Sequence, residues 1–161
     1  MNELNIRFGR KLTSHQIKSK SPFQYDAWIW PVNVGGEHWT SVALYPSHQV
    51  VLYYDSFGGG GAKCRECCLL MLEWAEMVWN SEGRNSPFPG NDWQIVQITN
   101  GPRQPNQYDC GVYCCQALYE LAQGLPSRRL AEGWRFGGTD LPNLRMVMTE
   151  EIATRRLRVR F

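Results

Sequence analysis

Apolar and polar positions alternate along the first half of the chain in the manner of β-strands. The segment 25–33 is rich in aromatic and β-branched residues and predicts a strand, in which Pro31 favours an edge position or a bulge. Residues 38–45 alternate between the two faces of a strand, and 49–55 form a second β-rich segment after the turn residues 46–48. These last two segments predict a β-hairpin.

Elsewhere the apolar residues recur at the 3.6-residue period of an α-helix. This spacing predicts a helix over 62–80, directly after a run of four glycines, and another over about 110–124. A last helix is expected from about 142 to about 157, and 93–99 predicts one more strand. The order strand, hairpin, helix, strand, helix, helix indicates an α+β layered domain.

The length and composition fit a single globular domain. We expect it to span 1–161, with a packed core at about 23–158 and a polar, basic arm at 1–22. No apolar run reaches the roughly 18 residues of a membrane span, and the N-terminal segment lacks the apolar core of a signal peptide. A net charge of +2 does not indicate a nucleic-acid partner. We therefore expect an intracellular protein, in the nucleus or the cytoplasm, without nucleic-acid or membrane partners.

The six cysteines lie in two short clusters, 64–68 and 110–115, inside segments with a helical period. Small secreted domains spread their cysteines through loops instead, so we expect reduced thiols. Cys64 and Cys67 have the two-residue spacing of a zinc-ligand pair, but the second cluster lacks a matching pair. We therefore expect no metal and no cofactor.

Cys110 is the cysteine whose position best suits a nucleophile. A nucleophilic thiol needs thiolate character, which a helix N-terminus and a nearby imidazole both favour. Cys110 lies where a proline-containing loop meets the predicted helix, and Gly111 leaves the approach to its sulfur uncrowded. A cysteine that packs beneath a turn would fit this position equally well, so a partner base must decide. The other five cysteines are expected to be small buried packing residues: Cys64, Cys67, Cys68, Cys114 and Cys115.

His38 is the most suitable base among the three histidines. His15 lies in the polar arm and His48 in the hairpin turn, whereas His38 begins a strand. A hairpin centred between positions 46 and 47 places Asp55 directly opposite His38, with Cβ atoms about 4.5 to 5.5 Å apart. An orienting carboxylate needs such a distance. A register one residue different would place Ser56 there instead.

Gln104 is a candidate donor for the oxyanion that forms when a thiolate attacks a carbonyl. It lies six residues before Cys110, in the loop that leads into the helix. Its side-chain amide and the backbone amide of Cys110 are expected to converge on one point. Other glutamines are equally polar, so position alone favours Gln104.

Three short motifs occur in the order and spacing of a known family. His38 and Trp39 form an HW pair, and Asp55 in YYDSFG follows seventeen residues after His38. The motif QPNQYDCG contains Gln104 and Cys110. From about residue 28 to about residue 121, the sequence resembles the ubiquitin-like-protein-specific cysteine proteases, of which the SUMO proteases are the best known.

The resemblance implies a papain-like α+β fold, with a mixed sheet packed against helices. It also implies cleavage after the C-terminal Gly-Gly of a ubiquitin-like modifier, most simply a SUMO-like one, in precursors, in conjugates or in both. In the family pattern His38 is the base, Asp55 orients it, Cys110 attacks and Gln104 lines the oxyanion hole. Trp39 matches the aromatic residue that covers the narrow tunnel for the glycine tail of the substrate.

One part of the family pattern is missing. Family members carry, well upstream of the histidine, helical segments with a Trp-Leu-Asn/Asp-Asp stretch that helps to bind the modifier. Only 37 residues precede His38, and they contain no counterpart. We expect one of two situations. The chain is a family member with a shortened substrate site, or further domains or a partner protein supply the missing segment.

Two other functions compete with the peptidase. One is a non-catalytic module that binds the tail of a ubiquitin-like modifier, but every catalytic residue type is present. The other is an acyltransferase on the same fold, since related enzymes use a similar histidine, acidic residue and cysteine. Trp39 and the QPNQYDCG loop favour the peptidase.

Overall fold

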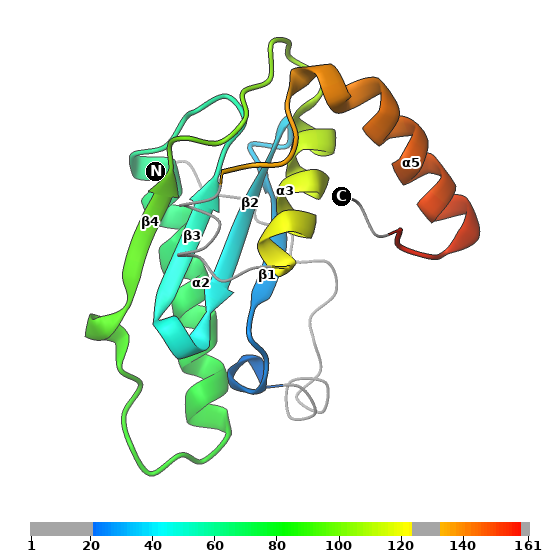
Figure 1. Ribbon diagram of the computed structural model, residues 1–161. Coiled ribbons are helices and arrows are strands. Elements are labelled where there is room, and N and C mark those ends of the chain that lie inside the picture. The colour runs from blue at the N-terminus through cyan, green and yellow to red at the C-terminus, as the bar shows by residue number, and fades with distance from the viewer. Residues whose placement is uncertain (1–20, 124–132, 159–161) are drawn as a thin grey trace.

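A four-stranded mixed sheet forms the centre of the fold (Figure 1). The structure is a computed structural model that describes residues 21–123 and 133–158. The strands β1 (Trp28–Val34), β2 (His38–Tyr45), β3 (Val50–Tyr54) and β4 (Gln94–Ile98) lie side by side in this order. β2 pairs antiparallel with both β1 and β3, whereas β4 is parallel to β3 because the chain crosses over between them.

Two helices cover opposite faces of this sheet (Figure 1). α2 (Ala62–Ser81) makes the crossover from β3 to β4, and α3 (Cys110–Ala122) lies on the other face. α5 (Leu141–Thr154) contacts α3 on the side away from the sheet. The short 3-10 helices are η1 (Pro22–Gln24), η2 (Pro46–His48), η3 (Gly90–Asp92) and η4 (Gly138–Asp140). This arrangement confirms the predicted α+β class.

Both faces of the central strands are buried because each face carries a helix. Val42 and Leu44 of β2 belong to the core cluster shared with α2. Ala43 and Tyr45 belong to the cluster shared with α3. Strands covered on both sides are apolar at successive positions, which explains why the alternation in this segment is incomplete.

The turn between β2 and β3 is centred one residue later than the sequence predicts. Tyr45 pairs with Val50, so residues 46–49 form the turn. Gln49, which the apolar pattern assigns to the strand, adopts a left-handed conformation with φ 52°. Its backbone N–H donates to Pro46 O at 3.3 Å and closes the turn. The strand therefore begins at Val50.

As a consequence, the predicted direct pairing of His38 with Asp55 is wrong. The ladder places Ser41 opposite Tyr54 and ends there, before it reaches His38. A shift of the hairpin centre by one residue changes each cross-strand pair by two residues, and two residues is the side-chain period of a strand. Every side chain therefore keeps its predicted face, although its direct partner changes.

The other predicted elements are confirmed with small shifts at their ends. The last helix stops at Thr154 rather than near 157, because Arg155 takes a left-handed conformation with φ 55°. The predicted helix end near Gly124 lies outside the described residues, and so do residues 1–20 of the predicted arm, with His15. Among the residues that the structure describes, no helix is both long and apolar enough to cross a membrane.

Candidate active site

His38 and Asp55 form a direct hydrogen bond where β2 begins and β3 ends. The distance from His38 Nε2 to Asp55 Oδ1 is 2.8 Å, and both side chains are largely buried. When Nε2 donates this bond, Nδ1 of a neutral imidazole carries the free lone pair. Nδ1 is buried and has no hydrogen-bond partner within residues 21–123 and 133–158. The pair therefore has the geometry of an imidazole base that a carboxylate holds in place.

Phe57 is part of this site, although no periodic pattern identifies it. Its backbone N–H donates to Asp55 Oδ1 at 2.8 Å and so fixes the carboxylate. Its ring stacks on the imidazole of His38, with centroids 4.6 Å apart and planes 28° apart. The only sequence signal is its place in the YYDSFG motif, two residues after Asp55. Phe57 thus restricts both members of the pair.

The glycine after this motif leaves room for the carboxylate. A Cβ added at Gly59 would lie 2.8 Å from Asp55 Oδ2, which is closer than real contacts of this kind. The backbone of Gly59 is not in a left-handed conformation, so the constraint is steric. A side chain at position 59 would displace Asp55.

Cys110 is the first residue of α3, and its side chain is buried. The unpaired N–H groups of a first helical turn carry a partial positive charge, which favours an anion at this position. Two bonds hold the next turn of α3 on β2: Ser41 Oγ donates to Cys114 O at 3.2 Å, and Cys114 Sγ donates to Thr40 O at 3.1 Å. Because His38 lies two residues before Thr40 on the same strand, these bonds bring the start of α3 to the start of β2.

Trp39 lies against the first turn of α3. A Cβ added at Gly111 would lie 3.9 Å from Trp39 Cδ1, so the indole is next to the residue that follows Cys110. The side chain of Trp39 is nevertheless 41% exposed. Trp39 therefore presents an exposed flat side chain next to the first turn of α3.

The other cysteines differ from Cys110 in their surroundings. Burial raises the pKa of Cys67 to about 11 and that of Cys114 to about 12, and it also raises the pKa of Cys64 and of Cys68. These four thiols therefore stay neutral in the core, as their predicted packing role requires. The same prediction is wrong for Cys115, which is exposed because it lies on the side of α3 away from the sheet.

Cys64, Cys67, Cys68, Cys110 and Cys114 are free thiols. Cys64 and Cys67, which have zinc-like spacing, are buried on α2 among apolar core side chains. Within residues 21–123 and 133–158, no group of three or more His, Cys, Asp or Glu side chains is placed to hold a metal ion.

Gln104 is buried and is held by Ser56, the residue after Asp55. Ser56 Oγ donates to Gln104 Oε1, and the backbone N–H of Gln104 donates to Ser56 O at 3.0 Å. Gln104 Nε2 donates to Asn106 O. Because an amide NH₂ group carries two hydrogens, this bond leaves one hydrogen for another acceptor. Ser56 therefore couples the loop after β3 to the loop before α3, a link that the sequence pattern does not reveal.

Asp109, directly before Cys110, belongs to a polar network that reaches α5. Asn106 Nδ2 donates to Asp109 Oδ2 at 2.7 Å, and Arg145 of α5 forms an ion pair with Asp109 Oδ1. The hydrogen bond from Asn106, together with Arg145, lowers the pKa of the Asp109 carboxyl below its ordinary value against the effect of burial. The lowered pKa means that the ionised carboxylate stabilises the folded state. This contribution to the free energy of folding is present at neutral pH and is lost as the pH falls through the lowered pKa.

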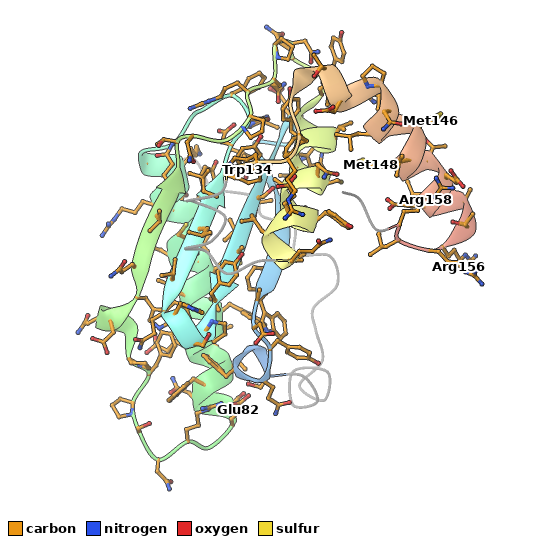
Figure 2. All side chains as sticks on the ribbon, viewed as in Figure 1. Glu82, Trp134, Met146, Met148, Arg156 and Arg158 are labelled. Carbon is orange, nitrogen blue, oxygen red and sulfur yellow. The ribbon has the colours of Figure 1, made fainter. Side chains whose placement is uncertain are left out.

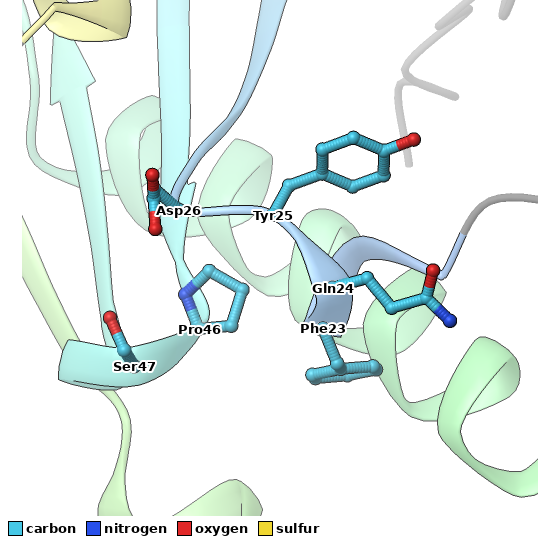
Figure 3. A pocket seen from close by; sticks show the side chains of 6 residues that line it. All are labelled: Phe23, Gln24, Tyr25, Asp26, Pro46 and Ser47. Atoms are coloured by element: carbon cyan, nitrogen blue, oxygen red, sulfur yellow. The ribbon is translucent and has the colours of Figure 1, made fainter.

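A pocket of about 280 Å³ lies at the other end of β2, in the region of the β2–β3 turn (Figure 3). It is lined by Phe23, Gln24, Tyr25, Asp26, Pro46 and Ser47. Since a strand rises about 3.4 Å per residue, this pocket is roughly 25 Å from His38. It contains none of the predicted site residues.

Comparisons with known proteins indicate the family of this chain. The model of the Ulp1 protease family, C-terminal catalytic domain, matches residues 6–159. A sentrin-specific protease of Caenorhabditis elegans is 32% identical over 135 residues, which cover 84% of this chain and 18% of that protein. A protease of bovine adenovirus 2 is 25% identical over 124 residues, which cover 76% of this chain and 57% of that protein.

Solved structures show the same fold. The C-terminal protease domain of Ulp1, in complex with Smt3, the yeast ortholog of SUMO, matches with a TM-score of 0.62 and 23% identity. The match covers 87% of this chain and 57% of the Ulp1 chain. The chain therefore belongs to the Ulp1 protease family, a family of cysteine proteases, which confirms the resemblance and the fold class inferred from the sequence.

Proposed function

We propose that this domain is a cysteine peptidase that cleaves after the C-terminal Gly-Gly of a ubiquitin-like modifier of the SUMO type. It would act on modifier precursors, on conjugates or on both, inside the cell. The observation that carries the proposal is the 2.8 Å bond between His38 and Asp55, which leaves Nδ1 of His38 without a hydrogen-bond partner among the described residues. The Ulp1 domain that shares this fold is bound to Smt3, which supports a SUMO-type substrate.

The chemistry follows from these positions. His38 Nδ1 accepts the proton of the Cys110 thiol, and the sulfur attacks the carbonyl carbon of the last glycine. Asp55 keeps the imidazole oriented and stabilises its protonated form. The second amide hydrogen of Gln104 and the backbone N–H of Cys110 are the proposed donors to the oxyanion.

The reaction is completed by further proton transfers through His38. The imidazolium gives its proton to the departing amine, which leaves a thioester between Cys110 and the modifier. His38 then removes a proton from a water molecule, which attacks the thioester, and returns this proton to the departing sulfur, so that the carboxylate of the modifier and the Cys110 thiol are released. Trp39 lies over the glycine tail, for which a flat ring is suited because glycine offers no side chain to bind.

The proposal is tested with a panel of ubiquitin-like modifiers, including SUMO and ubiquitin, that carry a C-terminal electrophile. The wild-type chain is expected to form a covalent adduct with a SUMO-type modifier, and a Cys110→Ser variant is expected to form none. Binding without an adduct would instead indicate a non-catalytic module. A panel that shows neither binding nor an adduct would contradict the proposal.

Gly59→Ala is expected to lower kcat/KM by about ten- to a hundredfold, because its Cβ would push Asp55 Oδ2 away and disturb the His38 base. Gly138→Ala is the matched control, since the nearest atom to its Cβ would be Tyr113 Oη at 3.6 Å. The measurement is the hydrolysis of a C-terminally activated SUMO-type modifier, together with the thermal unfolding of each variant. Equal activity of the two variants would show that the space around Asp55 is not critical.

A further inference from the structure

The residue directly before the nucleophile carries a buried negative charge. The side chain of Asp109 is only 7% exposed. Its backbone oxygen accepts bonds from Val112 N at 2.9 Å and from Tyr113 N at 3.1 Å, which begin α3. Its side chain makes no capping bond to the helix. The carboxylate is bonded instead to Asn106 and Arg145, which lie outside α3.

This network closes the turn in front of Cys110. Asn106 Oδ1 accepts the backbone N–H groups of Tyr108 and Asp109, each at 3.1 Å, while Asn106 Nδ2 donates to the Asp109 carboxylate. Arg145 ties this turn to a distant element, because it lies on α5, 36 residues after Asp109. The same guanidinium supplies the positive charge that faces the carboxylate.

A carboxylate next to a nucleophilic thiol has an electrostatic cost. A like charge nearby disfavours the anionic form of a titrating group, whereas an opposite charge favours it. The lowered pKa of Asp109 means that its carboxylate is ionised at neutral pH. Formation of a thiolate at the next residue would therefore add a second negative charge to the same short segment unless one of them is neutralised.

We propose that Arg145 is a positioning residue for Cys110, because its guanidinium neutralises the Asp109 carboxylate and holds the turn before α3 so that the thiolate forms readily. The inference rests on the proposed function only in taking Cys110 as the nucleophile. Its test uses thiol alkylation, which requires no modifier and no peptidase turnover.

Other ionisable groups near the start of α3, among the described residues, come from β2, the loops after β3 and before α3, and α3 itself: His38, Asp55, Arg103, Tyr108, Tyr113 and Cys114. The carboxylate of Asp55 is already paired with His38. Burial raises the pKa of Tyr113 and of Cys114, so both are neutral at physiological pH. Arg103 Nη2 donates to Thr99 O rather than to a carboxylate. The Asp109 charge is therefore the one that Arg145 balances.

The test is the pH–rate profile of Cys110 alkylation by iodoacetamide, followed by mass spectrometry of the peptide that contains Cys110. Arg145→Gln is expected to move the midpoint upward by about one pH unit, since it leaves the Asp109 charge unbalanced. At pH values below the midpoint, where the rate follows the thiolate fraction, this shift lowers the alkylation rate by about tenfold. Arg145→Lys, which keeps the positive charge, should stay close to wild type.

Combining substitutions of Asp109 and Arg145 shows whether Arg145 acts by neutralising the Asp109 charge or only by holding the structure. Asp109→Asn alone is expected to move the midpoint to lower pH, and Asp109→Asn with Arg145→Gln should return it close to the wild-type value. Arg158→Gln is the matched control, because Arg158, which follows the C-terminal end of α5 (Figure 2), pairs with the partly exposed Glu150 rather than with Asp109. Its midpoint should not move.

Three results would overturn the inference. They are an unmoved midpoint in a folded Arg145→Gln variant, a double variant displaced as far as Arg145→Gln alone, and an unmoved or raised midpoint in Asp109→Asn. Thermal unfolding of each variant shows whether it is folded. If Arg145→Gln does not fold, Asp109→Asn still decides the outcome. The two proposals can fail independently. If the midpoints shift as expected but the chain cleaves no modifier, the result supports this inference and contradicts the proposed function.

Discussion

Cys110→Ala and His38→Ala are each expected to lower kcat/KM by about 10³-fold or more, because the first removes the attacking sulfur and the second removes its base. Members of a catalytic unit act together, so the double variant should lose little more than either single variant. The measurement is steady-state hydrolysis of a C-terminally activated SUMO-type modifier.

If the loss of kcat/KM in the double variant equalled the product of the two single losses, the two residues would not act together. Cys114→Ala is a matched control for the cysteine, because the Cys114 thiol is buried one turn further along α3 and bonded to Thr40 O. Its substitution should lower thermal stability without a comparable loss of turnover. His48, which is bonded to Ser47 in the β2–β3 turn, is the matched control for the histidine.

Asp55→Ala is expected to lower kcat by about 10²- to 10⁴-fold, since His38 loses the acceptor that fixes its orientation and tautomer. Asp55→Asn should be milder, because the amide oxygen can still accept the bonds that Oδ1 now receives from His38 Nε2 and from the Phe57 N–H. What Asn lacks is the negative charge that stabilises the imidazolium. The two variants therefore separate orientation from charge.

The pH dependence of kcat/KM distinguishes the two contributions. With Asp55→Asn, the limb that reports the imidazole is expected to move to lower pH, because a nearby anion no longer favours the protonated ring. If Asp55→Asn lost as much activity as Asp55→Ala, the charge rather than the hydrogen bond would be the main contribution of this residue.

The contact between His38 and Asp55 was predictable from the sequence, but the pairing that leads to it was not. The predicted hairpin centre was wrong by one residue, because no pattern shows that Gln49 adopts a left-handed conformation and belongs to the turn. The error changed each pair by two residues and so preserved the faces. Beyond the end of the ladder, the two side chains then reach each other across the strand ends.

The parts of the site that the sequence did not predict depend on tertiary contacts. Phe57 stacks on His38 only because the chain turns back after Asp55. Arg145 reaches Asp109 only because α5 packs beside α3, and no periodicity within α5 singles out this residue. In contrast, the position of Cys110 at a helix start follows from local signals, namely the proline-containing loop and the apolar period that begins after it.

The most direct test of the central claim is to locate the covalent bond formed with a SUMO-type modifier that carries a C-terminal electrophile. After proteolysis of the adduct, mass spectrometry is expected to place the glycine remnant of the modifier on the peptide that contains Cys110, and on Cys110 itself. The adduct should form far more slowly in His38→Ala and should be absent in Cys110→Ser. A remnant on the exposed Cys115, or an adduct that persists in Cys110→Ser, would contradict the account.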